Sequence, residues 1–254
     1  MAAQVAYSED LAFIHESGFS DLAEAAARHV RDLVAPPALV VDIGCGGGTL
    51  LAELVRHGYD GFGVDLSPAM VDLARRRVRD ARIVVGSAYD APLPRCRVVT
   101  AIGEVLGYET GPRPEHLERV AAFFRRAGEA LEPGGVLLFD VATTERPEGR
   151  TEARREARAW GVTATAETSD GVLVRTIDHW RLERGSRRHG REAHRILLLD
   201  PEWVVGELRA AGFEAERLAG YDDHPFQEGW DAFLAQRPPL TAPSGTSSAR
   251  SARR

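Results

Sequence analysis

A run of glycines between a short apolar segment and a helical segment constrains the fold of this chain more than any other feature. The apolar segment 39–43 is followed by Gly44-Cys45-Gly46-Gly47-Gly48, and a helical pattern starts at Thr49. Glycines let a backbone turn tightly and approach a ligand, and a helix N-terminus offers unpaired N–H groups. Asp65 stands 21 residues after Gly44, at the end of the next apolar segment. In a doubly wound sheet this arrangement indicates an adenosine-containing cofactor, with the acid accepting hydrogen bonds from both ribose hydroxyl groups.

Short apolar segments alternate with amphipathic ones from residue 39 to about residue 140, and again after Pro201. This alternation predicts a Rossmann-like, doubly wound three-layer α/β/α fold with a seven-stranded, mostly parallel sheet. One long helix is expected over 8–34, ended by Pro36-Pro37. The other expected helices are 49–57, 67–79, 115–131 and 201–211, and the expected strands are 39–43, 61–65, 82–86, 97–101, 136–141, 213–220 and 230–236.

Residues 143–200 break this pattern and predict a small antiparallel β lid inserted before the last helix. The stretch 143–156 is polar and is expected to be a loop, and three strands are expected after it, over 158–168, 172–183 and 191–199. The expected organisation is an N-terminal helical lid (1–37), a core (38–142 and 201–237), the β lid (143–200) and a disordered low-complexity tail (238–254).

The amino-acid composition excludes several kinds of chemistry. All 32 basic residues are Arg, and the absence of Lys excludes Schiff-base lysine chemistry and a P-loop lysine. The chain has no Asn, so it has neither a catalytic Asn nor an N-glycosylation acceptor. The net charge of -6 gives no general attraction for nucleic-acid phosphate, although it leaves room for a local basic patch.

Cysteine content and hydropathy predict a cytoplasmic protein. Cys45 and Cys96 are too few for a disulfide framework or a cysteine-based zinc site. No apolar run approaches the roughly 20 residues that a membrane span requires. The first ten residues lack the basic and apolar regions of a secretory signal. No membrane partner is therefore expected.

The glycine motif resembles one family more than others that share its arrangement. A dinucleotide fingerprint, G-x-G-x-x-G, would need a glycine at position 49, where the chain has Thr. The string Val41-Asp42-Ile43-Gly44-Cys45-Gly46-Gly47-Gly48 instead resembles the first motif of class I S-adenosylmethionine-dependent methyltransferases, approximately V-D-x-G-C-G-x-G-x. The segments GVDLSPAM (63–70) and LEPGG (131–135) also fit that family. The resemblance covers about residues 5–236 and implies S-adenosylmethionine as the cofactor.

The resemblance implies a set of cofactor contacts. Asp42 is expected near the amino group of S-adenosylmethionine, and Asp65 is expected at its ribose; as alternatives, Asp42 caps the loop and Asp65 caps a helix. At the end of the third strand the family usually has Gly-Asp, but Ser87 replaces the acid here. The adenine contact is then expected from Ser87, the Ala88 amide or Asp90. The remaining implied cofactor residues are Gly44, Cys45, Gly46, Leu66, Met70 and Ile102, with a simple packing role as the alternative for Cys45.

For the acceptor side, the predicted catalytic residues are Glu104, His179 and Tyr221. Glu104 ends the fourth strand, where the family places residues between cofactor and substrate; alternatively it bonds loop amides. His179 shares one face of the strand 172–182 with Leu173, Arg175, Ile177 and Arg181, and this face either looks into the site or is solvated. Tyr7, His15 and Phe19 of the N-terminal segment, and Asp222 and His224 beside Tyr221, are further candidates.

These observations predict an S-adenosylmethionine-dependent methyltransferase that acts on an amine or hydroxyl of a small molecule. Nucleic acid is not expected as substrate, because an Asn-Pro-Pro-Tyr type motif is absent and Cys96 follows Arg95 rather than Pro. No metal is expected, because no zinc-binding His spacing occurs. The alternatives are an NAD(P)-dependent oxidoreductase, which would lack a Tyr-x-x-x-Lys dyad here, and a non-catalytic cofactor-binding scaffold. The oligomeric state is left open.

Overall fold

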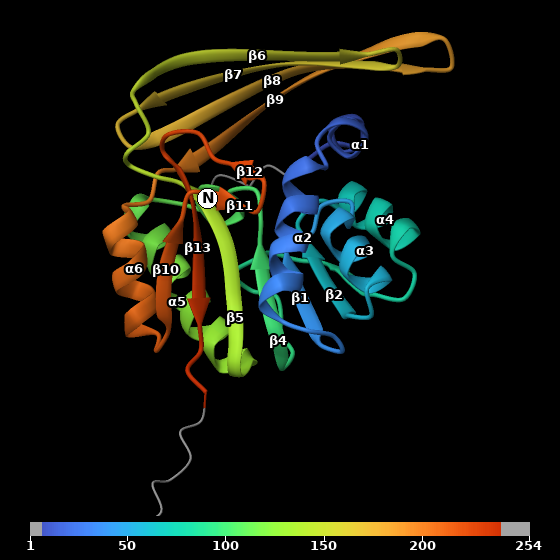
Figure 1. The fold of residues 1–254 in the computed structure, drawn as a ribbon. Helices are drawn as coiled ribbons and strands as arrows, with labels where there is room; N and C mark the ends of the chain where they lie inside the picture. The colour runs from blue at the N-terminus through green and yellow to red at the C-terminus, as the bar shows by residue number, and fades with distance from the viewer. Residues whose placement is uncertain (1–6, 240–254) are drawn as a thin grey trace, which may run out of the picture.

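A seven-stranded sheet forms the centre of the molecule in the computed structural model, which describes residues 7–239 (Figure 1). The strand order is β10-β13-β5-β4-β1-β2-β3. The five strands from β5 to β3 are parallel, whereas β13 runs antiparallel to both β5 and β10. The predicted mostly parallel sheet is confirmed. Its strands are β1 (Leu39–Ile43), β2 (Asp60–Asp65), β3 (Arg82–Val85), β4 (Cys96–Ala101), β5 (Leu131–Ala142), β10 (Glu214–Leu218) and β13 (Trp230–Gln236).

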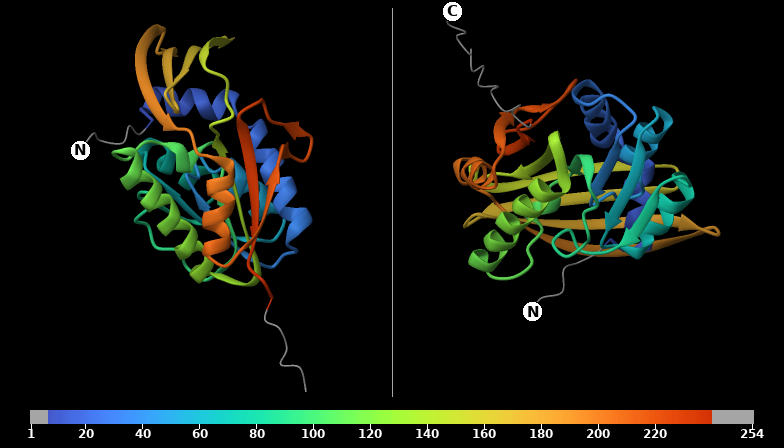
Figure 2. Two further views of the ribbon diagram at one scale, coloured as in Figure 1. Left: turned by 90° about the vertical axis from the view of Figure 1, so that its left-hand side faces the viewer. Right: turned by 90° about the horizontal axis from the view of Figure 1, so that it is seen from below.

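Helices cover both faces of this sheet, as the predicted three-layer fold requires (Figure 2). Side chains alternate between the faces along each strand, so Val40 and Val41 enter different cores. Val40 packs with helices α2, α3 and α4, and Val41 packs with α5 and α6. The helix bounds are α2 (Asp21–Leu33), α3 (Thr49–Arg56), α4 (Pro68–Arg77), α5 (Arg113–Ala130) and α6 (Pro201–Ala210).

The N-terminal segment forms two helices, so the prediction of one helix over 8–34 is wrong. Helix α1 (Glu9–Gly18) ends before Ser20, and α2 starts at Asp21. Leu11 and Ile14 of α1 pack against Trp160 and Ile177 of the lid sheet, whereas α2 packs on the central sheet. Of the two helices in the predicted N-terminal helical lid, α1 therefore packs on the lid sheet and α2 packs on the core.

The insertion forms a four-stranded antiparallel sheet that lies above the carboxyl ends of the parallel strands (Figure 1). Its strands are β6 (Gly149–Ala157), β7 (Trp160–Ser169), β8 (Val172–Glu183) and β9 (Ser186–Leu197). The predicted loop over 143–156 is wrong, because most of it forms the edge strand β6, and β9 starts earlier than expected. Between β10 and β13 the structure has a short hairpin that was not predicted, made of β11 (Gly220–Tyr221) and β12 (His224–Pro225).

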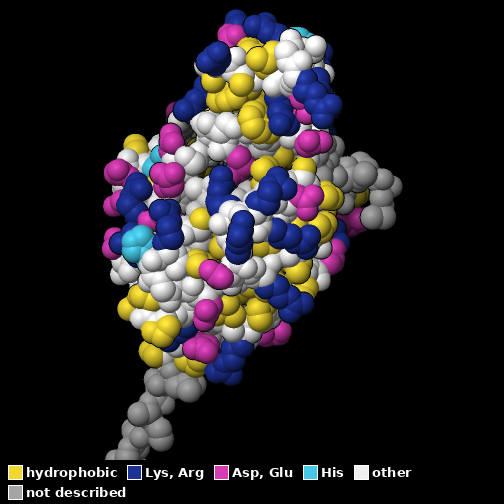
Figure 3. All heavy atoms as spheres, turned by 90° about the vertical axis from the view of Figure 1, so that its right-hand side faces the viewer, with side chains coloured by type: hydrophobic (Ala, Val, Ile, Leu, Met, Phe, Trp, Pro, Cys, Tyr) yellow, Lys and Arg dark blue, Asp and Glu magenta, His cyan; other side chains and the backbone are white. Residues whose placement is uncertain are grey.

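The surface over α4 carries the basic patch that the net charge left possible. Figure 3 shows arginine side chains gathered on the side of the molecule where α4 lies, and Arg75, Arg76 and Arg79 are exposed there. None of the helices within residues 7–239 is long and apolar enough to cross a membrane. Most of the predicted disordered tail, residues 240–254, lies outside the described residues.

Candidate active site

The glycine loop between β1 and α3 folds closely around the end of β2. The backbone N–H groups of Gly44 and Cys45 both donate to the Val64 carbonyl, at 2.7 and 2.9 Å. Gly44 has a φ of 72°, and a Cβ added there would overlap one methyl of Val105 and lie 2.9 Å from the other. Both the backbone conformation and the close contact therefore require glycine at this position.

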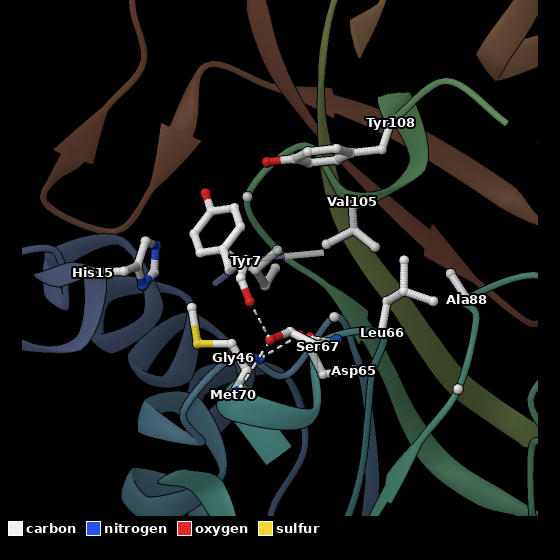
Figure 4. A pocket seen from close by; sticks show the side chains of 14 residues that line it. Tyr7, His15, Gly46, Asp65, Leu66, Ser67, Met70, Ala88, Val105 and Tyr108 are labelled. Carbon is white, nitrogen blue, oxygen red and sulfur yellow. Dashed lines mark hydrogen bonds between the residues drawn. The ribbon is translucent and has the colours of Figure 1, made fainter. Parts of the chain in front are cut away.

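Asp65, at the end of β2, holds the glycine loop and the start of α4 together. Its Oδ2 accepts a hydrogen bond from Gly46 N at 2.9 Å, and its Oδ1 accepts one from Ser67 N at 2.8 Å (Figure 4). Burial raises the pKa of the Asp65 carboxyl, and the two backbone hydrogen bonds oppose this shift. Each carboxylate oxygen can accept a further hydrogen bond. The side chain can therefore bind a ligand without giving up its structural contacts.

A cavity of about 150 Å³ lies between the strand ends and the N-terminal segment (Figure 4). Tyr7 and His15 cover it from the lid side, and the Ser67 hydroxyl donates to the Tyr7 carbonyl at 2.7 Å. The lining residues are Tyr7, His15, Gly44, Gly46, Asp65, Leu66, Ser67, Met70, Gly86, Ala88, Ile102, Gly103, Val105 and Tyr108. Seven predicted cofactor residues are therefore brought together here: Gly44, Gly46, Asp65, Leu66, Met70, Ala88 and Ile102.

Asp42 and Cys45 line a second cavity, of about 90 Å³, that shares residues with the first, and Phe19 lies at this second cavity as well. Asp42 is buried and accepts a hydrogen bond from the Thr100 hydroxyl at 2.7 Å. Burial, with a smaller contribution from Asp65, raises the Asp42 pKa to about 7. Ser87 lines neither cavity, since its hydroxyl accepts the Tyr89 N–H instead.

The turn after β4 is held by Asp140, a buried acid in β5 that was not predicted as a site residue. Asp140 accepts hydrogen bonds from the backbone N–H groups of Gly103 and Glu104, at 2.9 and 2.8 Å. Glu104 has a left-handed φ of 62°, a conformation that is uncommon for residues other than glycine. Burial raises the Asp140 pKa to about 6 despite these hydrogen bonds. The fold therefore fixes the backbone of Glu104 beside the cavity.

Polar side chains from three segments meet above this turn. Arg175 of β8 donates to Glu104 Oε2 at 2.7 Å, and this ion pair joins the lid sheet to the core. The hydroxyl groups of Tyr7 and Tyr108 interact, and burial raises the pKa of both while Arg175 acts in the opposite direction. The face of β8 that contains Arg175 thus looks toward the core rather than into solvent.

Helix α1 is fastened to the glycine loop by Glu16. Its carboxylate accepts the Gly47 N–H at 3.1 Å and the Thr49 hydroxyl at 3.3 Å, and it pairs with Arg77 of α4. Burial favours the neutral acid, but the hydrogen bonds from His15 and Arg77 outweigh it and lower the Glu16 pKa to about 2. The carboxylate is therefore ionised wherever the protein is folded near neutral pH.

Comparisons with known proteins agree with this geometry. A family model described as a methyltransferase domain matches residues 40–135. The ubiquinone biosynthesis O-methyltransferase of Methylobacterium sp. (strain 4-46) is 36% identical over 219 residues, which cover 82% of this chain and 75% of that protein. The chain belongs to the class I S-adenosylmethionine-dependent methyltransferase family.

Other relatives differ in acceptor. The dTDP-3-amino-3,6-dideoxy-alpha-D-glucopyranose N,N-dimethyltransferase of Streptomyces fradiae is 30% identical, covering 79% of this chain and 78% of that protein. The ubiquinone biosynthesis O-methyltransferase of Azorhizobium caulinodans is 29% identical over 75% of this chain, and the match spans 64% of that protein. The sugar N-methyltransferase KedS8 of Streptoalloteichus sp. shares the fold, with a TM-score of 0.73 and 23% identity over 94% of this chain and 96% of that one.

The residues of the methyltransferase cavity fit S-adenosylmethionine, the cofactor of this family. Asp65 keeps one free acceptor position on each oxygen for the ribose hydroxyl groups. Leu66, Met70 and Ala88 give apolar walls suited to an adenine ring, and Asp42 supplies a buried carboxylate behind the loop. The comparisons give no support to an oxidoreductase or to a non-catalytic scaffold. Residues 7–239 contain no group of His, Cys, Asp and Glu that could hold a metal ion.

None of the three predicted catalytic residues, Glu104, His179 and Tyr221, lines either cavity, although Gly103 and Val105 on each side of Glu104 line the larger one. Tyr221 is fully buried and donates its hydroxyl to Asp140 Oδ2 at 3.0 Å, so it supports the turn that holds Glu104. His179 is buried on the inner face of the lid sheet, 3.8 Å from Glu192. The methyltransferase fold therefore does not bring Glu104, His179 and Tyr221 to one point.

Sequence reasoning missed three residues of the candidate site: Tyr108 and Ser67, which line the cavity, and Asp140, which holds the turn beside it. Ser67 was recognised only as a helix cap, a role it also has, since its hydroxyl accepts the Met70 N–H at 3.3 Å. Tyr108 follows the 3-10 helix η1 (Val105–Gly107), which has no periodic pattern to find. Asp140 had a usable signal, because it is the lone acid in residues 135–142, the buried and otherwise apolar part of β5.

Proposed function

We propose that this methyltransferase modifies the amine of a small, polar, hydroxylated acceptor, an amino sugar being the first candidate. The acceptor would lie between Tyr7, Tyr108 and the Glu104 turn, beneath the lid sheet. In this proposal the acceptor is a small molecule rather than a nucleic acid. The proposed setting is the cytoplasm, since both cysteines, Cys45 and Cys96, are buried and unpaired.

The observation that carries this proposal is the polar cluster above the turn after β4. Two tyrosine hydroxyl groups and the Glu104–Arg175 pair surround the space next to Ile102 and Gly103. These groups can accept and donate hydrogen bonds to the hydroxyl and amino groups of a sugar. Glu104 and Arg175 already pair with each other, but the hydrogen-bonding positions that these groups keep free suit a sugar and would be unused by a long apolar chain.

The relatives support two acceptor chemistries. One relative is named for a dTDP-amino sugar and others are named for ubiquinone biosynthesis. The polar cluster favours the amino sugar, and an O-acceptor from ubiquinone biosynthesis is the second candidate. In either case S-adenosylmethionine supplies a methyl group that is already activated on a sulfonium. The protein's own part is alignment of the acceptor and exclusion of water, which can contribute about 7–11 kcal/mol.

Within the proposal, Glu104 accepts a hydrogen bond from the acceptor while Arg175 donates to its carboxylate oxygen Oε2. The left-handed turn, fixed through Asp140, aims the Glu104 side chain toward the lid. Tyr7 and Tyr108 close the acceptor space from the N-terminal segment and from the loop after η1. Asp65, Leu66, Met70 and Ala88 bind the cofactor, with Asp42 at its amino group.

Cofactor binding is tested by calorimetry with S-adenosylhomocysteine, NADH and NADPH. Wild type is expected to bind S-adenosylhomocysteine only. Asp65→Ala removes two charge-assisted hydrogen bonds worth about 1.5 kcal/mol or more each, so affinity falls about 100-fold. Asp60→Ala, at the exposed start of the same strand, is the matched control and should bind as wild type does. Binding of a nicotinamide cofactor would overturn the proposal.

Acceptor chemistry is tested by mass spectrometry after incubation with S-adenosylmethionine. The probes are dTDP-3-amino-3,6-dideoxy-alpha-D-glucopyranose and a ubiquinone precursor with a free hydroxyl. The expected product is the amino sugar with one or two added methyl groups, formed by wild type and not by Asp65→Ala at limiting cofactor. Methylation of the ubiquinone precursor alone would contradict the amino-sugar assignment.

A further inference from the structure

A fully buried histidine, His116, lies on the inward face of α5, which is otherwise apolar. The other buried residues of this helix are Val120, Ala121, Phe123, Phe124 and Ala127. His116 lines neither cavity of the candidate site. An imidazole among apolar side chains costs free energy unless its polar atoms are hydrogen-bonded. The partners of the ring therefore indicate why a histidine occupies this position.

The two ring nitrogens of His116 bind residues on both sides of one short loop. Nε2 lies 3.0 Å from the Leu106 carbonyl oxygen, and Nδ1 lies 3.1 Å from the Thr110 hydroxyl oxygen. A carbonyl oxygen can only accept, so Nε2 carries the proton and donates it. Burial lowers the pKa of His116, so the ring is neutral near neutral pH and its Nδ1 accepts the Thr110 hydroxyl. One imidazole thus joins Leu106 to Thr110.

Tyr108 lies at the middle of this loop. Leu106 stands two residues before it and Thr110 two residues after it. Tyr108 lines the cavity, and Figure 4 shows its ring extending from the loop toward Tyr7. Both hydrogen bonds of His116 therefore act on the residues that flank Tyr108, and loss of the imidazole would free the loop to shift.

The Leu106 carbonyl is held by a second donor, Tyr89. The Tyr89 hydroxyl donates to this oxygen at 2.9 Å, so both of its lone pairs are used. The Tyr89 and His116 rings meet edge to face, with their centroids 5.9 Å apart. Tyr89 follows Ala88, which lines the cavity. The Leu106 carbonyl therefore joins η1 to α5 and to the segment after β3.

The lid strand β9 contacts the same loop. Tyr108 pairs with Ile196 in an antiparallel bridge, and the Glu109 N–H donates to the Arg195 carbonyl at 2.9 Å. A Cβ at position 107 would lie 2.7 Å from a methyl of Ile196, so Gly107 allows the loop to approach β9 closely. The loop that contains Tyr108 is thus held by α5 and by β9.

The Glu104 turn has an anchor of its own. Asp140 accepts the N–H groups of Gly103 and Glu104, whereas His116 binds Leu106 and Thr110. The two buried residues therefore fix successive parts of one segment. A change at His116 is expected to move the loop after η1 more than the turn before it.

We propose that His116 is a positioning residue for methyl transfer, which sets the place of Tyr108 in the acceptor space through Leu106 and Thr110. The inference rests on the proposed function, because that function puts the acceptor beside Tyr108. It goes beyond that function by assigning a role in acceptor binding to a residue outside the cavity. Cofactor binding is expected to be independent of His116, because Asp65 and the glycine loop are held by other contacts.

The first experiment measures initial rates against acceptor concentration, with whichever probe wild type methylates. His116→Leu removes both hydrogen bonds and should lower kcat/KM about tenfold, mostly by raising KM for the acceptor. His116→Gln keeps a donor for the Leu106 carbonyl and should recover part of this loss. Calorimetry with S-adenosylhomocysteine should give the wild-type affinity for both variants.

Phe124→Leu is the matched control for a loss of stability alone. Phe124 is buried on the same helix, two turns after His116, and its ring packs against Phe139. This variant should unfold at lower urea concentration than wild type and keep the wild-type KM. Equal effects of His116→Leu and Phe124→Leu on KM would show that His116 only stabilises the fold, and would overturn the proposal.

The Thr110 hydroxyl gives a second test of the same loop. Thr110→Val removes the donor to Nδ1 with little change in shape and should raise KM about threefold, whereas Thr110→Ser keeps the hydroxyl and should behave as wild type. Equal KM values for the Val and Ser variants would contradict a role for this hydrogen bond.

The third experiment needs no acceptor. Spectra of protein labelled in its histidine and tyrosine rings are recorded with S-adenosylhomocysteine, and Tyr108→Phe assigns the Tyr108 signal. His116 is expected to carry its proton on Nε2 and not on Nδ1. His116→Leu should shift the Tyr108 signal and leave that of Tyr59, which donates to the distant Val34 carbonyl, unchanged.

The outcomes separate this inference from the proposed function. If wild type methylates a probe and His116→Leu keeps the wild-type kcat/KM, the positioning role is wrong and methylation of that probe is unaffected. A proton on Nδ1, or an unmoved Tyr108 signal, also overturns the positioning role. If wild type methylates neither probe, the proposed function fails, and the Tyr108 signal alone then decides whether His116 positions Tyr108.

Discussion

The substitution Gly44→Ala tests the packing of the glycine loop most directly. Gly44 has a φ of 72°, and the added Cβ would overlap one methyl of Val105 and lie 2.9 Å from the other. A left-handed conformation costs a residue other than glycine about 1–2 kcal/mol. Overpacking against Val105 adds about 1–3 kcal/mol. Gly44→Ala should therefore lower the free energy of unfolding by about 2–5 kcal/mol.

Gly134 provides a matched control for the backbone contribution. Its φ is 76°, nearly the same as that of Gly44, but a Cβ there would meet no atom within 4 Å. Gly134→Ala should therefore cost only the conformational part, about 1–2 kcal/mol. The difference between the two variants isolates the overlap with Val105.

Val105→Ala completes a double-mutant cycle. It removes both methyl groups that the new Cβ would meet, so the double variant should recover about 1–3 kcal/mol relative to additivity. Urea denaturation gives the free energies, and calorimetry with S-adenosylhomocysteine shows whether binding returns as well. Zero coupling between the two positions, or equal costs at Gly44 and Gly134, would refute the proposed role of this contact.

Three further predictions concern buried acids and the lid. The pKa of Asp42 is about 7 in the folded state and about 4 in the unfolded state. As pH rises from about 4 to 7, wild type should therefore lose stability relative to Asp42→Asn, by at most about 4 kcal/mol. Denaturation series at each pH measure this difference. Glu16→Gln should weaken the contact between α1 and the glycine loop and speed S-adenosylhomocysteine dissociation several-fold in stopped-flow measurements, whereas Glu24→Gln should not. Tyr221→Phe should lower kcat while leaving S-adenosylhomocysteine affinity unchanged, because it removes a hydrogen bond to Asp140 without touching the cofactor cavity; a change in affinity alone would contradict this.

The central sheet could be predicted because its signals are local. Leu39–Ile43 is apolar apart from Asp42, and the glycines after it mark the turn, so strand, loop and helix follow from neighbouring residues. Ser67 and Pro68 likewise mark the start of α4. The residues proposed to bind the cofactor are then brought together, since the ends of neighbouring parallel strands must meet at one edge of the sheet.

The strand β6 could not be predicted because its pattern is set by its partner rather than by its own residues. All nine residues of Gly149–Ala157 are exposed, so the strand has no apolar alternation. It exists because β7 offers a free edge that pairs with it over its whole length. Charged residues on an edge strand also discourage pairing with other chains, which makes such a strand resemble a loop in sequence.

The proposed acceptor side was harder to predict because Asp140, which fixes the turn that carries Glu104, acts by accepting backbone hydrogen bonds. A carboxylate in an apolar strand is costly unless it is hydrogen-bonded, and Asp140 accepts from Gly103, Glu104, Tyr221 and Trp230. These donors come from the turn after β4 and from the region around β13, far apart in sequence. The left-handed conformation of Glu104 is a second cost at the same turn. Burial of the Asp140 carboxylate and the left-handed conformation of Glu104 both cost free energy at this turn, and the hydrogen bonds that Asp140 accepts there offset these costs. The fold therefore specifies the position of Glu104 more strictly than stability alone requires.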